Sequence, residues 1–435
     1  PPLFRLLPIS FSYPTTGTSL DNIILGTETT RLGFIERRTV EKKVRELSEK
    51  YSLKVDLHKR TESISVGMQQ RVEILKMLYR DNEILIFDEP TAVLTPQETD
   101  KLFAVLRNMR DAGKAIVIIT HKMHEVEELS DRVAVLRHGQ YIGDMPTKET
   151  NAQEMTNMMV GHSVTLNIAR PDPVDPKPRI EVKGLTVRSI DGVLKLQDIS
   201  FTAMSGEILG IAGISGSGQR ELLEAIAGLQ KLSGGEVIYH DPKTDKEENL
   251  RNKTPIEIRN LGVRLSFVPE DRLGMGLVGN MGITDNMMLR SYKKGKSFFL
   301  QKKEPKNLAN KIIKDLKVVT PDANTPVRRL SGGNVQKVLV GREIAASPTV
   351  LMAAYPVRGL DINSSYTIYN LLTEQKEKGV AVIFVGEDLD VLLSLCDRIM
   401  VIGGGQINGI VDARTTTKEE IGLMMVKSKG GNADE

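Results

Sequence analysis

The sequence predicts an α/β protein made of two copies of one domain, and three observations lead to this fold class. Short apolar runs alternate with amphipathic segments along the 435 residues, which is typical of parallel strands connected by helices. Residues of the first half recur in the second at a constant interval, as Ser65 and Gly67 do at Ser331 and Gly333 (331 − 65 = 266). The interval holds over roughly a hundred residues and exceeds any solenoid repeat, so it indicates a tandem duplication.

Each copy is expected to hold the same order of elements. In the first copy, the apolar run 84–87 predicts a buried strand, the apolar spacing over 102–109 predicts a helix, and 115–120 predicts the next strand. Residues 21–60 and 285–320 are richer in charge and in helical period, which indicates a helical insert in each copy. The second copy repeats the strand, helix and strand at 350–353, 366–378 and 381–385.

The predicted domain boundaries are a first domain at 1–164, a linker at 165–179 and a second domain at 180–435. Four prolines within 170–178 predict a semi-rigid, extended connection. The segment 180–266 has no counterpart in the first copy, because 266 − 266 = 0. We therefore expect the first copy to be truncated at its N-terminus and to lack its opening portion.

Composition narrows the classes of function. The net charge of +3 is too small to favour nucleic acid or an anionic membrane as the main partner. Cys396 is the only cysteine, so an intramolecular disulfide is excluded and a reducing compartment is expected. No apolar run approaches the roughly 18 residues that cross a bilayer. We therefore expect a protein that can sit at a membrane without spanning it.

A glycine-rich segment at 213–220 follows an expected strand at 207–212 and precedes an expected helix. This arrangement forms a phosphate cradle, because backbone amides at the helix start face an anion. Gln219 stands where the phosphate-loop pattern has lysine, and Arg220 where it has a metal-binding hydroxyl, so we expect nucleotide binding with little hydrolysis. A plain glycine turn is the alternative. The candidate binding residues are Gly213, Gly216, Ser217, Gly218, Gln219 and Arg220.

The segment 330–337 opens another expected helix and resembles the signature motif of the ATP-binding cassette (ABC) ATPases. The resemblance implies that this helix start contacts the γ-phosphate of ATP held by the opposite domain, which suits a helix dipole and free amides. The first copy has Val66 and Met68 within the motif, so its signature is weakened. The signature residues of the second copy are Ser331, Gly332, Gly333 and Asn334.

Asp88 and Glu89 end the expected strand 84–87 and resemble the Walker B element of the same family. The resemblance implies that Asp88 holds Mg²⁺ through water and that Glu89 polarises the attacking water as general base. The second copy has Ala354 and Tyr355 at these positions, which supply neither a metal ligand nor a base at neutral pH.

Three further positions fit the family pattern. His121 follows the strand 115–120 and resembles the switch histidine that contacts the γ-phosphate, whereas its counterpart is Glu387. Glu270 lies at or near the glutamine position of the Q-loop, which in the family lies under the coupling helix of a membrane partner. Residues 358–361 resemble the D-loop.

The resemblance implies that each ATP lies between the Walker motifs of one copy and the signature of the other. Asp88, Glu89 and His121 would then pair with the intact signature, and all altered motifs fall in the second site. Random loss would scatter between sites, so we expect one hydrolytic site and one structural or regulatory site. The phosphate loop of the competent site is expected upstream of residue 1, so this chain alone is not expected to sustain turnover.

Within the family, the chain resembles the tandem ATPase subunits of bacterial sugar and nucleoside importers, through the run 90–98 and the segment 330–334. Residues 355–359 and 213–220 are closer to the nucleoside branch. This resemblance implies ATP and Mg²⁺ as cofactors, transmembrane permeases and a substrate-binding lipoprotein as partners, and a peripheral position on the cytoplasmic face of the membrane. The solute is not specified, because neither motif touches it.

Two alternatives stay open. One is a soluble, non-transport ABC protein of translation or repair, although translation members usually have two competent sites and repair members need cysteine clusters for zinc. The other is a fragment that binds nucleotide without hydrolysis.

Overall fold

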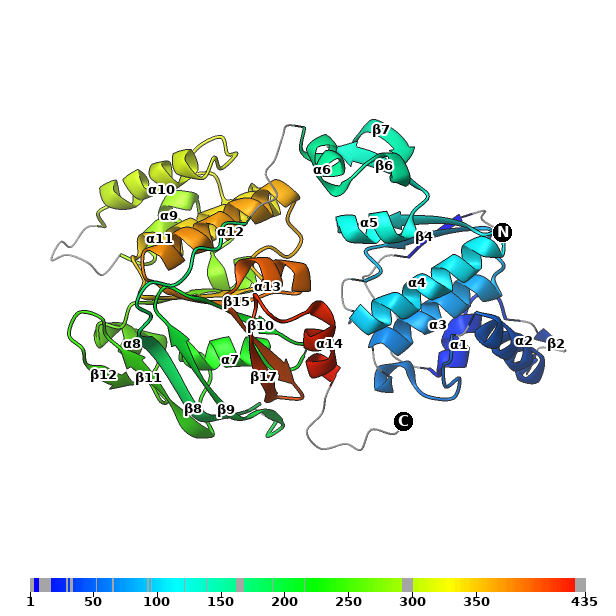
Figure 1. The fold of residues 1–435 in the computed structure, drawn as a ribbon, viewed down its shortest axis with the longest axis horizontal. Helices are drawn as coiled ribbons and strands as arrows, with labels where there is room; N and C mark the ends of the chain where they lie inside the picture. The colour runs from blue at the N-terminus through cyan, green and yellow to red at the C-terminus, as the bar shows by residue number, and fades with distance from the viewer. Residues whose placement is uncertain are drawn as a thin grey trace. The chain divides into compact units, whose positions relative to one another are not determined.

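The chain divides into two compact units, Pro1–Ser163 and Val164–Glu435, which are described here one at a time (Figure 1). No helix within the described segments has the length and apolar character needed to cross a bilayer. The structure is a computed structural model that describes residues 4–7, 17–28, 30–31, 34–51, 53–64, 66–91, 94, 96–120, 122–137, 139–161, 168–189, 191–214, 216–291 and 300–426.

Unit 2 is built on a six-stranded sheet in the order β13-β14-β15-β10-β16-β17. Its strands are parallel except for β17, which forms a hairpin with β16. Every residue of β10, β14 and β15 is buried, as expected for parallel strands covered on both faces. The strands are β10 Ile208–Ala212, β13 Leu265–Val268, β14 Val350–Ala354, β15 Ala381–Val385, β16 Arg398–Gly403 and β17 Gln406–Asp412.

A second, antiparallel sheet in the order β12-β11-β8-β9 covers one face of the central sheet together with helix α7 (Gln219–Ile226). The sequence analysis did not predict β9, β11 and β12, because strands with polar outer faces lack a continuous apolar run. Figure 1 shows β8, β9 and β11 side by side below the central sheet. The strands are β8 Pro178–Arg188, β9 Leu194–Met204, β11 Gly234–His240 and β12 Glu247–Asn249.

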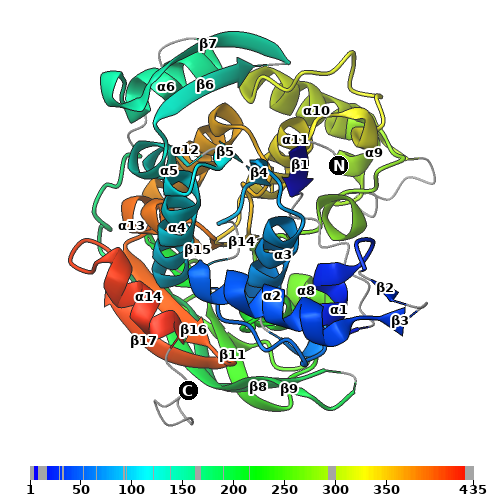
Figure 2. The ribbon, with the colours of Figure 1, turned by 90° about the vertical axis from the view of Figure 1, so that its right-hand side faces the viewer.

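Helices cover the opposite face of the central sheet, where Leu351, Val382 and Phe384 join one large apolar core. Helix α14 packs beside the β16–β17 hairpin (Figure 2). The helical insert predicted at 285–320 is present as α9 and α10. The helices are α8 Pro255–Asn260, α9 Ile283–Met288, α10 Lys303–Asp315, α11 Gly332–Ala345, α12 Ile362–Glu377, α13 Leu389–Leu395 and α14 Lys418–Val426, with a π-helical turn at Arg272–Gly276 and a 3₁₀ turn at Val327–Arg329.

Unit 1 contains a three-stranded parallel sheet in the order β1-β4-β5 and a separate β6–β7 hairpin. Its strands are β1 Phe4–Leu7, β2 Thr30–Arg31, β3 Phe34–Ile35, β4 Ile84–Asp88, β5 Ala115–Ile119, β6 Arg132–Arg137 and β7 Gln140–Pro146. Its helices are α1 Ser19–Ile24, α2 Arg37–Lys50, α3 Val66–Tyr79, α4 Pro96–Asp111, α5 Met123–Leu129 and α6 Ala152–Val160, with 3₁₀ turns at Thr61–Ser63 and Thr147–Glu149.

Element bounds recur between the units at the interval found in the sequence. β4 begins at Ile84 and β14 at Val350 (84 + 266 = 350), and the same interval relates α3 to α11, α4 to α12 and β5 to β15. The structure therefore agrees with a tandem α/β repeat. The interval persists through the final helices, since α6 begins at Ala152 and α14 at Lys418.

The two units differ at one edge of the sheet. In unit 2, β10 lies between β15 and β16 and hydrogen-bonds to both. Among the described residues of unit 1, no strand occupies the corresponding place beside β5. Val117 and Ile119 of β5 are accordingly 48% and 47% exposed, whereas their counterparts Ile383 and Val385 are fully buried.

Candidate functional site

The carboxyl ends of the parallel strands in unit 2 carry the glycine-rich loop predicted at 213–220. Gly218 caps α7 with φ +107°, and a Cβ placed there would lie 2.4 Å from Leu196 Cδ2, so a side chain is excluded on both grounds. Gly213 is confined by backbone contact alone, because its Cβ would lie 2.5 Å from the Ile402 carbonyl oxygen. The loop therefore brings backbone close to whatever occupies it. Of the predicted loop, Ser215 lies outside the described residues.

The two polar side chains at the end of the loop are held by the protein itself. Gln219 is buried, and its Nε2 donates to the Ile214 carbonyl at 3.2 Å. Arg220 donates from Nε to Glu224 Oε1 at 2.6 Å, and this bond raises the pKa of the guanidinium. Neither side chain offers the metal-binding hydroxyl of a hydrolytic phosphate loop.

Four side chains from three neighbouring strand ends gather beside this loop. Arg358 forms ion pairs with Glu270, which follows β13, and with Glu387, which follows β15, the latter at 3.2 Å between Nε and Oε1. The guanidinium also lies over the ring of Tyr355, 5.8 Å from its centroid. Burial raises the pKa of Tyr355 well above its usual range, so the phenol cannot act as a base at neutral pH. The sequence analysis singled out Glu270, Tyr355 and Glu387 separately. It did not predict that Arg358 contacts all three.

The signature motif opens α11, as predicted. Ser331 is the N-cap residue, but its hydroxyl accepts from Asn334 Nδ2 at 2.9 Å, and no side-chain bond to the helix amides is formed. Gly333 packs so closely that a Cβ would lie 2.5 Å from Ser364 Oγ, and one at Gly332 would lie 3.2 Å from Arg272 Nη1. A cleft of about 530 Å³ opens here, lined by Glu270, Asp271, Arg272, Leu273, Leu330, Gly332, Val335 and Arg358.

In unit 1, Asp88 is the last residue of β4 and Glu89 begins the turn after it. Glu89 has φ +43°, and its backbone N–H donates to the Ile119 carbonyl at 2.8 Å. Tyr355 has the same backbone, with φ +47° and an N–H bond of 2.9 Å to the Val385 carbonyl. Such left-handed positions cost about 1–3 kcal/mol for a residue with a side chain. The two units thus share one strained turn and differ in the chemistry it presents.

A polar network fixes this turn in unit 1, and sequence reasoning missed its central residue. Glu125 is 3% exposed and accepts hydrogen bonds from the hydroxyls of Thr91 and Thr120, the second at 3.0 Å. Lys122 Nζ lies 3.3 Å from Glu125 Oε1 and donates to Thr91 Oγ1. The network ties the turn after β4 to the end of β5. In unit 2 the counterparts of Glu125 and Thr91 are Val391 and Val357, which pack on the core.

Some predicted residues fall outside the described parts of the chain. These are His121, Ser65 of the weakened signature, and Ala92, Val93 and Thr95 of the first D-loop segment. Within unit 1 the structure brings Asp88 and Glu89 to the end of β5, and within unit 2 helix α7, which follows the glycine-rich loop, packs on β14, the strand that precedes Tyr355.

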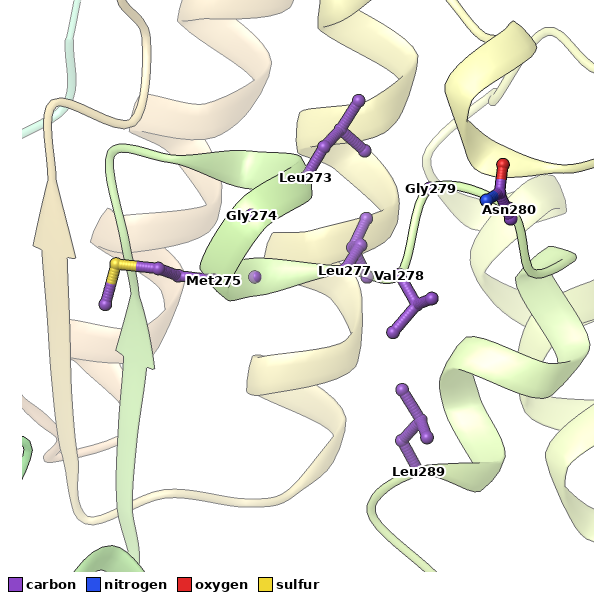
Figure 3. Close-up of a pocket in the computed structure, with 9 residues that line it drawn as sticks. Leu273, Gly274, Met275, Leu277, Val278, Gly279, Asn280 and Leu289 are labelled. Atoms are coloured by element: carbon purple, nitrogen blue, oxygen red, sulfur yellow. The ribbon is translucent and has the colours of Figure 1, made fainter.

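A second cleft of unit 2, of about 490 Å³, lies beside the π-helical turn and is lined by Leu273, Gly274, Met275, Gly276, Leu277, Val278, Gly279, Asn280 and Leu289. Figure 3 shows Val278 and Leu289 pointing toward one another, with Met275 on the far side of the loop. Leu273, Met275 and Val278 are each more than a third exposed, at 41%, 43% and 42%. Met275 Sδ lies 3.9 Å from Arg220 Nη2, so this turn connects the cleft to the glycine-rich loop.

Comparison with known protein families finds one family whose model matches this chain. The model of the family described as "ABC transporter" matches residues 13–92 and 196–356, more than half of the chain. These two matches fall in the two units and include the start of the turn after β4 and of the turn after β14.

Curated relatives match nearly the whole chain. The nucleoside import ATP-binding protein NupA of Lactococcus lactis is 40% identical over 422 residues, which are 96% of this chain and 81% of NupA. The guanosine import ATP-binding protein NupO of Bacillus subtilis is 40% identical over 421 residues, with the same coverage of 96% and 81%. The ribose import ATP-binding protein RbsA of Oceanobacillus iheyensis is 34% identical over 96% of this chain and 82% of RbsA.

Among solved structures, the archaeal ribosome recycling factor aABCE1, in complex with the ribosomal stalk protein aP1, aligns with a TM-score of 0.61 at 17% identity. The alignment covers 92% of this chain and 71% of that one. At this identity the likeness shows a shared fold.

Proposed function

Because the chain belongs to the ABC transporter family, we propose that it is the ATP-binding subunit of an importer that couples ATP hydrolysis to uptake of a nucleoside or a simple sugar. The names of NupA, NupO and RbsA support this class of solute. The 40% identity to NupA and NupO, against 34% to RbsA, favours a nucleoside. The similarity to aABCE1 shows only a shared fold and does not support a role in translation.

The proposal that the two units have different roles rests on one observation. The same left-handed turn presents Asp88 and Glu89 in unit 1 and Ala354 and Tyr355 in unit 2. In our proposal, Asp88, Glu89 and His121 act opposite the signature residues Ser331–Asn334, and this composite site hydrolyses ATP. The unit 2 loop forms the second site, which binds nucleotide without turnover.

Magnesium fits the unit 1 turn by its donor chemistry. Carboxylate oxygens are the protein ligands that Mg²⁺ prefers, and the turn presents two of them in succession. Asp88 would hold the ion through water, where it would neutralise charge on the phosphates. Glu89 would orient the attacking water and accept its proton. The polar network around Glu125 would keep the turn fixed while it does so.

We propose the domain limits 1–164 and 180–435, joined by residues 165–179. Residues 168–177 of this segment hold no helix or strand, β8 begins at Pro178, and Arg170 donates from Nη1 to the Leu393 and Cys396 carbonyls at 2.7 and 2.8 Å. Because the described residues of unit 1 hold no glycine-rich loop, turnover should require such a loop opposite Asp88.

The cleft beside the π-helical turn is the proposed contact for the permease partners. Its exposed apolar side chains follow Glu270 closely, and Met275 links the cleft to Arg220. A permease bound there would place the subunit on the cytoplasmic face of the membrane, with a lipoprotein reached through the complex. Val278→Asp should reduce co-purification with the permeases, while Leu261→Asp, at a residue of similar exposure (40%), should not.

The division of labour is tested by ATPase assays on the complete transporter. Glu89→Gln should lower kcat by about 10²–10⁴ because it removes the general base. Tyr355→Phe should leave kcat within about twofold, because a buried, protonated phenol supplies no base. Equal losses from the two substitutions would contradict the one-site proposal.

A further inference from the structure

A buried carboxylate joins two strand ends of unit 1. Glu125 of α5 is 3% exposed, and one of its oxygens accepts from the hydroxyl of Thr91, in the turn that begins at Glu89. Its other oxygen accepts from the hydroxyl of Thr120, which directly follows β5, at 3.0 Å. A carboxylate buried to this degree cannot contact a bound nucleotide, so its contacts act within the protein.

The same network holds the chain on both sides of residue 121. Lys122 Nζ lies 3.3 Å from Glu125 Oε1 and donates to Thr91 Oγ1 at 3.2 Å. The backbone N–H of Lys122 donates to Thr120 Oγ1 at 3.1 Å. Both neighbours of the predicted switch histidine are therefore connected to one carboxylate, and through it to the turn after β4.

Unit 2 has a different residue at every position of this network. The counterparts of Thr91, Thr120, Lys122 and Glu125 are Val357, Gly386, Asp388 and Val391. Even so, the turn has the same backbone in both units, with φ +43° at Glu89 and +47° at Tyr355. The turn can thus form without the network, and the network accompanies only the copy whose turn presents an acidic pair.

Stability alone does not explain a buried carboxylate at this place. Removing an ion pair from water costs about as much as the pairing returns, and apolar residues of similar volume are often as stabilising or more so. Val357 and Val391 provide that apolar alternative within the same chain. What the polar network adds is direction, because hydrogen bonds constrain both distance and angle whereas apolar contacts do not.

We propose that Glu125 is a positioning residue for hydrolysis, which fixes the Glu89 turn relative to the segment that carries His121. The inference rests on the proposed hydrolysis at the unit 1 turn. Reacting groups must be held within about 0.5 Å of their productive places, and a displacement of about 1 Å can lower the rate about a hundredfold. Glu125 supplies this constraint through two threonine hydroxyls and Lys122, without touching the phosphates.

The test is ATP hydrolysis by the complete transporter, with kcat and KM measured separately. Thr91→Val removes the hydroxyl that Glu125 and Lys122 share, at nearly constant volume. It should lower kcat about tenfold or more and leave KM for ATP within about twofold, because the network acts on the reacting geometry and not on binding. Thr91→Ser keeps the hydroxyl and should retain most of kcat.

A double variant, Thr91→Val with Glu125→Val, gives unit 1 the residue pair of unit 2. It should lower kcat about tenfold to a hundredfold. Its midpoint of urea unfolding should not fall, since the replacement is apolar and of a kind that the fold already packs. Activity is thereby separated from folding.

Two further variants separate position from charge. Glu125→Gln can still bond to both threonine hydroxyls, once as acceptor and once as donor, so kcat should stay within about fivefold. A loss as large as that of Glu89→Gln would make Glu125 a base and overturn the inference. Glu128→Gln, at a half-exposed carboxylate of the same helix that pairs with Arg107, is the matched control and should leave kcat unchanged.

The remaining outcomes are also decisive. Wild-type kcat in Thr91→Val and in the double variant would overturn the inference and leave the importer function standing. A loss of activity that follows a lower unfolding midpoint, without rescue by Thr91→Ser, would show that the network serves folding alone and would also overturn it. Full kcat in Glu89→Gln would instead refute hydrolysis at the unit 1 turn, and this inference with it.

Discussion

Strands β5 and β15 occupy the same place in two copies of one fold, yet they meet different surroundings. Alternate residues of β15 point into two cores, and Ile383 and Val385 belong to the core formed with the antiparallel sheet and α7. In β5 the corresponding Val117 and Ile119 are about half exposed, while their neighbours Ile116 and Ile118 pack on the unit 1 core. The comparison teaches that the repeat preserves the strand and its apolar pattern even where the described chain supplies no layer to cover one face.

The aspartate just before the next strand, Asp397 in unit 2 and Asp131 in unit 1, is also buried in one unit and exposed in the other. Asp397 accepts the Ile208 N–H of β10 at 2.8 Å and pairs with buried Lys376 at 2.7 Å. Its counterpart Asp131 pairs with Arg110 at 3.5 Å, and the two side chains are 75% and 43% exposed. The residue type recurs, but its role in holding β10 is seen only in unit 2.

The largest effect should come from removing this aspartate. Asp397→Ala strands a buried Lys376 ammonium and removes the acceptor for β10, which should lower the free energy of unfolding of unit 2 by about 3–5 kcal/mol. Asp131→Ala breaks a solvent-exposed pair and should cost unit 1 about 1 kcal/mol or less. Calorimetry of the full chain, with the two units followed as separate transitions, measures both. Equal losses would show that Asp131 is buried in solution.

Shortening one apolar side chain in each strand should again lower the stability of unit 2 more than that of unit 1, with smaller losses than the aspartate substitutions. Ile383→Ala leaves a cavity in a fully packed core and should cost about 2–5 kcal/mol. Val117→Ala at the half-exposed counterpart should cost about 0.5 kcal/mol. Urea unfolding with probes in each unit reads the difference. A large loss from Val117→Ala would mean that another layer covers β5 in solution.

The smallest difference in stability between the units is expected from the N-cap residues of the first helix in each helical insert. Thr18 and Gly282 are the N-caps of α1 and α9, and each forms an isolated bridge, to Arg60 and Pro326 respectively. Thr18→Gly should cost only a few tenths of a kcal/mol. Gly282→Thr should cost about 1–3 kcal/mol, since its Cβ would lie 2.6 Å from the Asn324 carbonyl oxygen. Thermal unfolding of both variants would reveal an inverted order if the glycine were a loosely packed cap.

Strongly apolar segments could be predicted from the sequence because their pattern is local. The strands expected at 84–87, 115–120, 350–353 and 381–385 are present, and so is the phosphate-loop context of strand, turn and helix. The antiparallel sheet of unit 2 was mostly missed. Its strands alternate buried and exposed residues along β8 and β9, so burial there depends on a partner sheet distant in sequence.

The candidate site likewise contains features that the sequence predicts and features that it does not. The positions of Asp88, Glu89 and the glycine-rich loop follow from motifs that lie within a few residues of one another. The ion pairs of Arg358 join residues up to 88 positions apart, and Glu125 bonds to Thr91 at a separation of 34. Contacts of this kind are made only when strand ends meet at one edge of a sheet, and no local spacing predicts them.

The turn shared by Glu89 and Tyr355 bears on which substitutions unit 2 can accept. Both units keep the same left-handed backbone at this turn, although unit 1 has two carboxylates there and unit 2 has a methyl group and a phenol. The unfavourable φ costs about 1–3 kcal/mol in either unit. The backbone hydrogen bond to the end of β5 or β15 is common to both turns, so the conformation does not depend on one kind of side chain. An acidic pair introduced at 354 and 355 would therefore meet a backbone that already has the conformation of Asp88 and Glu89.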